Sequence, residues 1–132
     1  MDNFIHQFNI NENICSKLIE YHKGNIEYKF QGANSNKVVD KNIKDSMDVA
    51  VYPSVESYFL ELKKGLNSFF KVNSFPEPNN IRLSLFTQEG FNIQHYPAGG
   101  GYKDWHFERT DIKGHIITRT LVFMTYLNDV ED

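Results

Sequence analysis

One short segment of the chain, residues 103–109, carries an imidazole and a carboxylate two positions apart, at His106 and Glu108. Because side chains alternate across an extended backbone, a strand here places both of them on one face, together with Asp104. A histidine and a carboxylate that converge supply two of the three protein ligands of the facial site that holds non-haem Fe(II). The spacing is compatible with a metal site but by itself is weak evidence for one. A solvent-facing ion pair is the alternative, since a histidine two residues from an acid is common by chance.

Two tyrosines on expected β-strands are candidates for contacts to a small ligand. Tyr96 shares a strand face with the polar Gln94, and Tyr126 shares one with Thr118 and Thr120. We expect both hydroxyls to project inward, where they can line a ligand cavity. An ordinary half-buried tyrosine is the alternative at each position.

The N-terminal part of the chain is expected to be mainly helical. Asn11 is a cap-type residue ahead of an apolar stripe that predicts a helix over about 12–22. Apolar side chains recur every three or four residues over 58–70, which predicts a second helix. Ser54 precedes this helix and is expected to cap it. Between the two helices, the alternation of apolar side chains over 44–52 is a weak strand pattern.

From Ile81 onward the apolar period changes from near four to two, which predicts a β-rich C-terminal part. The loop at 97–101 holds three consecutive glycines, which tolerate close backbone approach. The expected strands lie at 81–86, at 91–96, from about 103 onward and, as the longest run, at 116–127.

Three motifs in this part together resemble a known family. They are Tyr96-Pro-Ala-Gly-Gly-Gly-Tyr102, His106-Phe-Glu108, and the run from Arg119 that ends in Tyr126-Leu-Asn-Asp129. In order and approximate spacing they are similar to the 2-oxoglutarate- and Fe(II)-dependent dioxygenases of the prolyl 4-hydroxylase-like branch. The resemblance implies that His106 and Glu108 are iron ligands and that Tyr96 and Tyr126 contact 2-oxoglutarate. It implies no protein acid or base as a catalytic residue.

The resemblance also implies a reaction. Oxidative decarboxylation of 2-oxoglutarate yields succinate and carbon dioxide, and a C–H bond of a prolyl, other peptidyl or small-molecule substrate is hydroxylated. The expected cofactors are Fe(II), 2-oxoglutarate as cosubstrate and ascorbate as an auxiliary reductant. The substrate and the native metal stay open, because ligand type only biases the choice of metal.

The fold class implied is α+β in a single domain spanning 1–132. A helical support region over 1–80 packs on 81–132, the first half of a double-stranded β-helix of the jelly-roll or cupin-like kind. Glu108 departs from the family, in which most members carry Asp there. The family's distal histidine and its basic 2-oxoglutarate residue lie beyond the Tyr-Leu-Asn segment, so the chain is expected to be an N-terminal fragment with its third metal ligand undetermined.

Composition excludes several other classes. The 132 residues hold 14 Lys plus Arg against 17 Asp plus Glu, a net charge of −3, which gives no basic footprint for nucleic acid. The single cysteine, Cys15, cannot form an internal disulfide and predicts a reducing cytoplasm. No apolar run is long enough to cross a bilayer, so no membrane partner is expected.

Two other functions stay open. One is a non-catalytic remnant that binds a partner, or forms a homodimer with another copy, through an exposed β-edge. The other is a cupin-type metal-binding barrel, although such sites usually use more histidines than this segment supplies. The dioxygenase stands first among the three.

Overall fold

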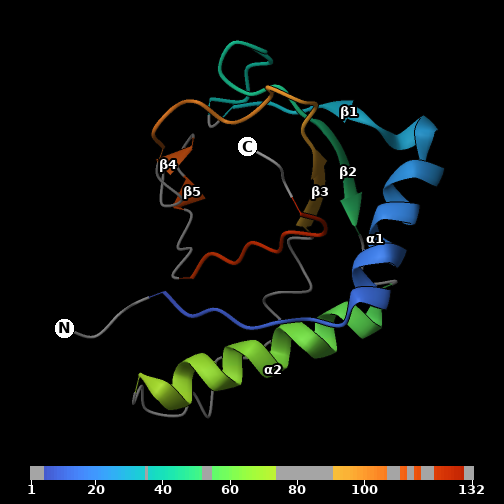
Figure 1. The fold of residues 1–132 in the computed structure, drawn as a ribbon. Coiled ribbons are helices and arrows are strands. Elements are labelled where there is room, and N and C mark those ends of the chain that lie inside the picture. Colours follow the sequence, from blue (N-terminus) through green and yellow to red (C-terminus); the bar gives the residue numbers. More distant parts are fainter. Residues whose placement is uncertain are drawn as a thin grey trace.

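The computed structural model describes residues 5–34, 36–51, 55–73, 91–106, 111–112, 115–116 and 121–129. Two helices and short antiparallel strands make up the regular structure of these ranges (Figure 1). In chain order the elements are α1 (Glu12–Gly24), a 3-10 turn (Ile26–Tyr28), β1 (Phe30–Gln31), β2 (Met47–Val51), α2 (Glu56–Val72), β3 (Phe91–His95), β4 (Asp111–Ile112) and β5 (His115–Ile116). The predicted α+β class is therefore confirmed at this coarse level.

The main sheet has three antiparallel strands in the order β1-β2-β3, so β2 is central. Its two longer strands pair along their whole length, with Val49 opposite Ile93 and Met47 opposite His95. Both lie where the sequence predicts strands, at 44–52 and 91–96. β4 and β5 form a separate two-stranded pair.

One face of this sheet supplies the apolar core. Val51 of β2 and Ile93 of β3 cluster with Leu18 of α1 and Tyr58 of α2, and all four are buried. Because side chains alternate along a strand, Val51 and Ile93 lie on the side of the sheet that faces the helices, and Asp48 lies on the other side. The sheet thus has an apolar face toward the helices and a polar face away from them.

Both predicted helices form. Asn11 caps α1, since its side-chain Oδ1 accepts a hydrogen bond from the Asn13 backbone N–H at 2.9 Å. α2 begins one residue later than its expected cap implies: the N-cap residue is Val55, which makes no side-chain cap hydrogen bond, and Ser54 lies outside the described residues. The face of α2 turned to the protein is apolar, with Tyr58, Leu62, Leu66 and Phe69 buried.

The predicted strand at 116–127 is wrong over its described C-terminal part. β5 includes His115 and Ile116, but 121–129 has no regular secondary structure, and 117–120 lie outside the described residues. A strand needs a hydrogen-bonded neighbour as well as an alternating pattern. The burial along 121–127 still alternates, half-buried and exposed side chains following one another.

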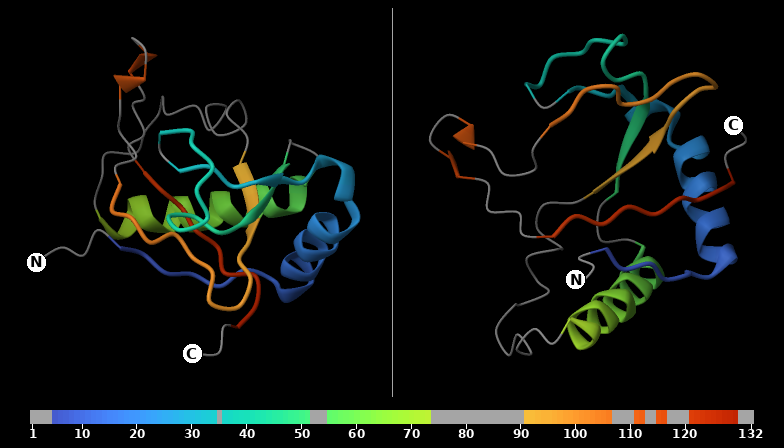
Figure 2. Two further views of the ribbon diagram at one scale, coloured as in Figure 1. Left: turned by 90° about the horizontal axis from the view of Figure 1, so that it is seen from above. Right: turned by 60° about the vertical axis from the view of Figure 1, so that its left-hand side comes forward.

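This segment instead crosses the core between the start of β3 and α2, as the views from two sides agree (Figure 2). Phe123 packs edge-on against Phe91 of β3, with ring centroids 6.2 Å apart. The hydroxyls of Thr125 and Tyr58 share a hydrogen bond of 2.8 Å. Packing and one side-chain hydrogen bond therefore hold 121–127 against both β3 and α2.

Two further expectations concern the remaining strands. The strand expected from about 103 is reduced, among the described residues, to an isolated bridge between Tyr102 and Lys44. The strand expected at 81–86 lies outside the described residues.

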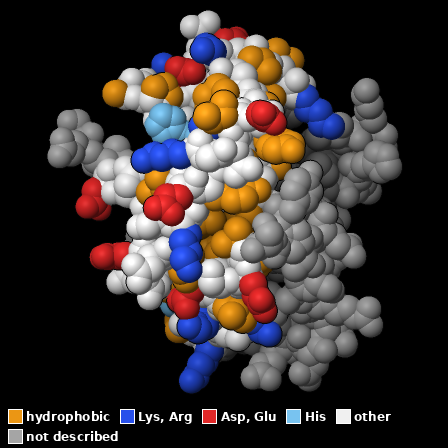
Figure 3. Space-filling view, turned by 90° about the vertical axis from the view of Figure 1, so that its right-hand side faces the viewer, with side chains coloured by type: hydrophobic (Ala, Val, Ile, Leu, Met, Phe, Trp, Pro, Cys, Tyr) orange, Lys and Arg blue, Asp and Glu red, His pale blue; other side chains and the backbone are white. Residues whose placement is uncertain are grey.

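No helix in the described ranges is both long and apolar enough to cross a membrane. On the side that carries α1, charged groups of both signs alternate with apolar ones (Figure 3).

Gly65 gives a test of how the N-terminal segment packs on α2. The ring of Phe8 fills the space where a β-carbon at Gly65 would stand. Glycine to alanine in a helix normally stabilises a protein by about 1 kcal/mol. Here we expect the opposite sign: Gly65→Ala should lower the unfolding free energy by about 1–3 kcal/mol, because Phe8 must move.

Urea denaturation measures this effect, and Gly24→Ala is the matched control. Gly24 is the last residue of α1, and an added β-carbon there meets nothing within 4 Å. We expect no loss of stability in the control. Equal effects in the two variants would contradict the contact between Phe8 and α2.

Candidate functional site

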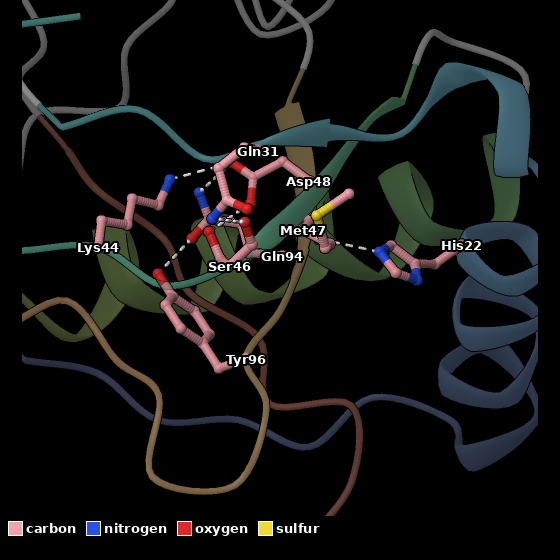
Figure 4. A network of polar contacts seen from close by, with 8 residues as sticks. All are labelled: His22, Gln31, Lys44, Ser46, Met47, Asp48, Gln94 and Tyr96. Atoms are coloured by element: carbon pink, nitrogen blue, oxygen red, sulfur yellow. Dashed lines mark hydrogen bonds and ion pairs between the residues drawn. The ribbon is translucent and has the colours of Figure 1, made fainter. Parts of the chain in front are cut away.

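A buried carboxylate organises the polar face of the sheet (Figure 4). Asp48 of β2 is 1% exposed and accepts hydrogen bonds from three side chains. Its donors are Ser46 Oγ at 2.7 Å, Lys44 Nζ at 2.9 Å and Gln94 Nε2 at 3.3 Å. Burying a charge is costly unless it is paired and hydrogen-bonded, so this set of donors is what allows Asp48 to lie here. We call Lys44, Ser46, Asp48, Gln94 and Tyr96 the polar sheet face.

Lys44 connects this face to the loop that follows β3. Its ammonium group forms a buried ion pair with Asp48 and lies 6.0 Å from the centroid of the Tyr102 ring. The chain passes very close on the other side, because a β-carbon at Gly32 would stand 2.8 Å from Lys44 Cε and closer still to Ser46 Oγ. Only glycine leaves room for this approach.

Tyr96 is held by the same network. A carboxylate only accepts, so Gln94 must turn its NH₂ toward Asp48 and its Oε1 the other way. Tyr96 donates its hydroxyl hydrogen to that Oε1 at 3.0 Å. Burial, and then the negative charge of Asp48, raise the pKa of Tyr96 above its usual value. The shared face of Tyr96 and Gln94 is as predicted, and the phenol stays protonated through neutral pH.

His106 lies on the loop beyond Tyr102 and is exposed. Its ring centroid is 4.3 Å from that of Tyr102, and its Nδ1 is 3.3 Å from the backbone oxygen of Asp104. A carbonyl only accepts, so Nδ1 is the donor in this contact. Glu108, the predicted second iron ligand, lies outside the described residues, and the pairing of His106 with Glu108 stays a prediction.

Tyr126 is not turned inward. It is 76% exposed, whereas its neighbours Thr125 and Leu127 are half-buried against the core. Side chains along 121–127 point alternately toward the core and away from it. Because Phe123 and Leu127 pack on the core cluster, Tyr126, an odd number of positions from each, faces outward. Thr118 and Thr120 lie outside the described residues. A role of Tyr126 in contacting 2-oxoglutarate stays a prediction.

The structure thus brings two of the four predicted site residues to one region. Contacts run from Tyr96 through Gln94 to Asp48 and Lys44, and from Lys44 through Tyr102 to His106. Tyr126 does not join them. Within the described ranges, no three His, Cys, Asp or Glu side chains gather closely enough to hold a metal ion.

Sequence reasoning missed the residues that build this region. Asp48 stands between Met47 and Val49 in a strand whose other members are apolar, and Lys44 precedes it by four positions. A charged residue inside a short central strand is a signal of a buried polar contact, because such residues are almost never buried without a partner. That signal was present in the sequence, although the partner Gln94 is distant along the chain.

No known family model, curated protein or solved structure matches this chain. The functional argument therefore rests on the chain's own residues and their contacts.

The ion pair beneath the polar sheet face gives a stability prediction. Lys44→Met leaves the carboxylate of Asp48 buried without a counter-charge, and we expect a loss of about 3–5 kcal/mol of unfolding free energy. Lys41→Met is the matched control, because Lys41 pairs with Asp45 at 3.9 Å with its side chain 68% exposed. We expect a change below about 1 kcal/mol there. Denaturation of both variants in urea measures the difference, and equal losses would contradict the importance of the buried pair.

The raised pKa of Tyr96 predicts a pH dependence. A phenol whose folded pKa lies above its unfolded value of about 10 contributes stability below that pH. The contribution is lost as pH rises through the folded pKa. We expect the urea midpoint of the wild type to fall more steeply above about pH 10 than that of Tyr96→Phe, which has no phenol to ionise there. Parallel profiles for the two proteins would show that Asp48 and burial do not act on Tyr96.

Proposed function

We propose that this protein is an oxygenase that uses Fe(II) and 2-oxoglutarate to hydroxylate a C–H bond of a peptidyl or small-molecule substrate. The sequence support is the order of its motifs, in which His106 and Glu108 follow the loop that begins at Tyr96. The observation that carries the proposal is the contact path that joins Tyr96 to His106 across the polar sheet face. A predicted cosubstrate contact and a predicted iron ligand therefore lie in one region.

The donor chemistry fits iron. An imidazole and a carboxylate are the ligand types of the facial site that leaves positions open for substrate and oxygen. The exposed position of His106 leaves its ring within reach of an ion from solvent. Fe(II), when bound, would supply the binding of the keto acid and the activation of oxygen.

Tyr96 would supply the contact to the keto acid. Its single hydroxyl hydrogen is donated to Gln94 Oε1, so a carboxylate that binds here would take that hydrogen in place of the amide. Asp48 keeps Gln94 in position while this exchange occurs, because the amide NH₂ remains bonded to the carboxylate. The phenol is thereby kept protonated and ready to donate to an anion.

The finer fold belongs to the same proposal. We assign the β1-β2-β3 sheet and the extended segment 121–129 to a jelly-roll-type β-structure. The support is the antiparallel pairing of the sheet and the period-two burial along 121–127.

Anaerobic addition of Fe(II) and 2-oxoglutarate tests the function. We expect a visible metal-to-ligand charge-transfer band and, on admission of air, release of succinate that depends on 2-oxoglutarate. His106→Ala and Glu108→Gln should abolish both signals, because each removes one iron ligand. His6→Gln is the control: His6 contacts Ser68 and lies outside the region, so both signals should persist. Folded wild-type protein that gives neither signal would overturn the proposal.

A second candidate function is an interaction module, and one observation favours it. Val122, Met124 and Tyr126 form an apolar row on the outer side of 121–127, each more than 60% exposed. Exposed apolar rows of this kind often mark protein contacts. Light scattering over a range of concentrations distinguishes the candidates: self-association that Met124→Lys abolishes, in protein with no charge-transfer band, favours the module.

A further inference from the structure

A second pair of metal-ligating side chains lies away from the polar sheet face. His22 is in the last turn of α1 and is 7% exposed, while His95 is the last residue of β3 and is exposed. Their ring centroids are 5.8 Å apart. By strand alternation His95 lies on the face of the sheet opposite to Tyr96, so this pair is distinct from the region proposed to bind iron.

A hydrogen bond fixes the state of the His22 ring. Its Nε2 lies 2.9 Å from the backbone oxygen of Met47 (Figure 4). A carbonyl only accepts, so Nε2 carries the hydrogen, and the lone pair of the neutral ring is at Nδ1. Histidines that bind metals commonly donate their other ring N–H to a carbonyl in this way, which fixes the tautomer and the ring orientation.

The remaining nitrogen of His22 has no hydrogen-bond partner in the described part of the chain. The contact with Met47 is the one hydrogen bond that the His22 side chain makes with the described part of the chain. No buried side-chain nitrogen or oxygen in that part lacks a partner. Nδ1, which has none there, therefore cannot be fully buried.

The separation of the rings suits a shared ion. With a metal–nitrogen bond of 2.0–2.1 Å and tetrahedral or slightly wider angles, two imidazoles on one ion have centroids about 5–6 Å apart. The observed 5.8 Å lies in that interval. His95 is the residue free to adjust, because it is exposed at the end of its strand and rotates without disturbing the core.

The surroundings favour a cation of the late transition series. The last turn of a helix carries the negative end of its dipole, which attracts cations. Met47 is the register partner of His95, so its thioether lies on the same side of the sheet, and it is 37% exposed. Imidazoles suit zinc and copper, and a thioether adds a soft donor that copper accepts.

We propose that His22 and His95 bind a divalent late transition-metal ion, with Zn(II) and Cu(II) as the probes, and that this ion joins the end of α1 to the end of β3. Two protein nitrogens hold the ion, and water completes its coordination. The proposal does not depend on the oxygenase.

Calorimetric titration with Zn(II), and separately with Cu(II), in the absence of 2-oxoglutarate tests the site. In His106→Ala, which lacks one ligand of the proposed iron site, we expect one ion to bind per chain with an affinity that a further His95→Ala change lowers at least about tenfold, through the loss of one ligand. His22→Gln is the sharper variant, because its amide NH₂ still donates to the Met47 carbonyl but has no second nitrogen for the metal. We expect His22→Gln to fold, by circular dichroism, and to lose the ion. His6→Gln should bind as the wild type does.

Electron paramagnetic resonance of the Cu(II) form provides a second readout. In His106→Ala, where the proposed iron site is removed, we expect hyperfine coupling to two imidazole nitrogens, and to one after the further change His95→Ala. His106→Ala should keep this signal even though it abolishes the iron signals, so failure of this site and failure of the oxygenase proposal are distinguishable. Unchanged Zn(II) and Cu(II) affinity in the folded double variant His22→Gln/His95→Ala would overturn the inference.

Discussion

The polar side of this protein depends on one buried charge, the carboxylate of Asp48. Taken out of water without partners, a carboxylate costs several kcal/mol, and here Lys44, Ser46 and Gln94 together satisfy it. These donors come from the approach to β2 and from β3, so satisfying one charge fixes how the two segments lie. The orientation of Tyr96, and the position of the loop that carries His106, follow from that arrangement.

The pairing of β2 with β3 places both candidate sites at once. With Asp48 opposite Gln94, the polar side chains share one face, and the next pair, Met47 and His95, must lie on the other. A slip of β3 by one residue would turn Gln94 toward the core and expose Ile93 on the polar side. The apolar contacts of the core and the satisfied charge of Asp48 therefore support the same register, one from each side of the sheet.

Periodicity predicted the elements that carry their own pattern. The apolar stripes of α1 and α2, the cap at Asn11 and the shared face of Tyr96 with Gln94 follow from local spacing and agree with the structure. The segment 116–127 shows the limit of this reasoning. Its alternation is real, but a strand also requires a neighbouring backbone, and alternation alone does not say which parity faces the core.

The sequence by itself determined the helices, the two longer strands and the residue types available for metal and ligand binding, because each depends on neighbours within a few positions. Only the tertiary structure decided that Gln94 donates a hydrogen bond to the carboxylate of Asp48, that Tyr126 faces outward and that His22 meets His95. Those contacts join segments that are far apart along the chain. They arise where packing of the core brings the segments together, and the local pattern of residues does not predict which segments will meet.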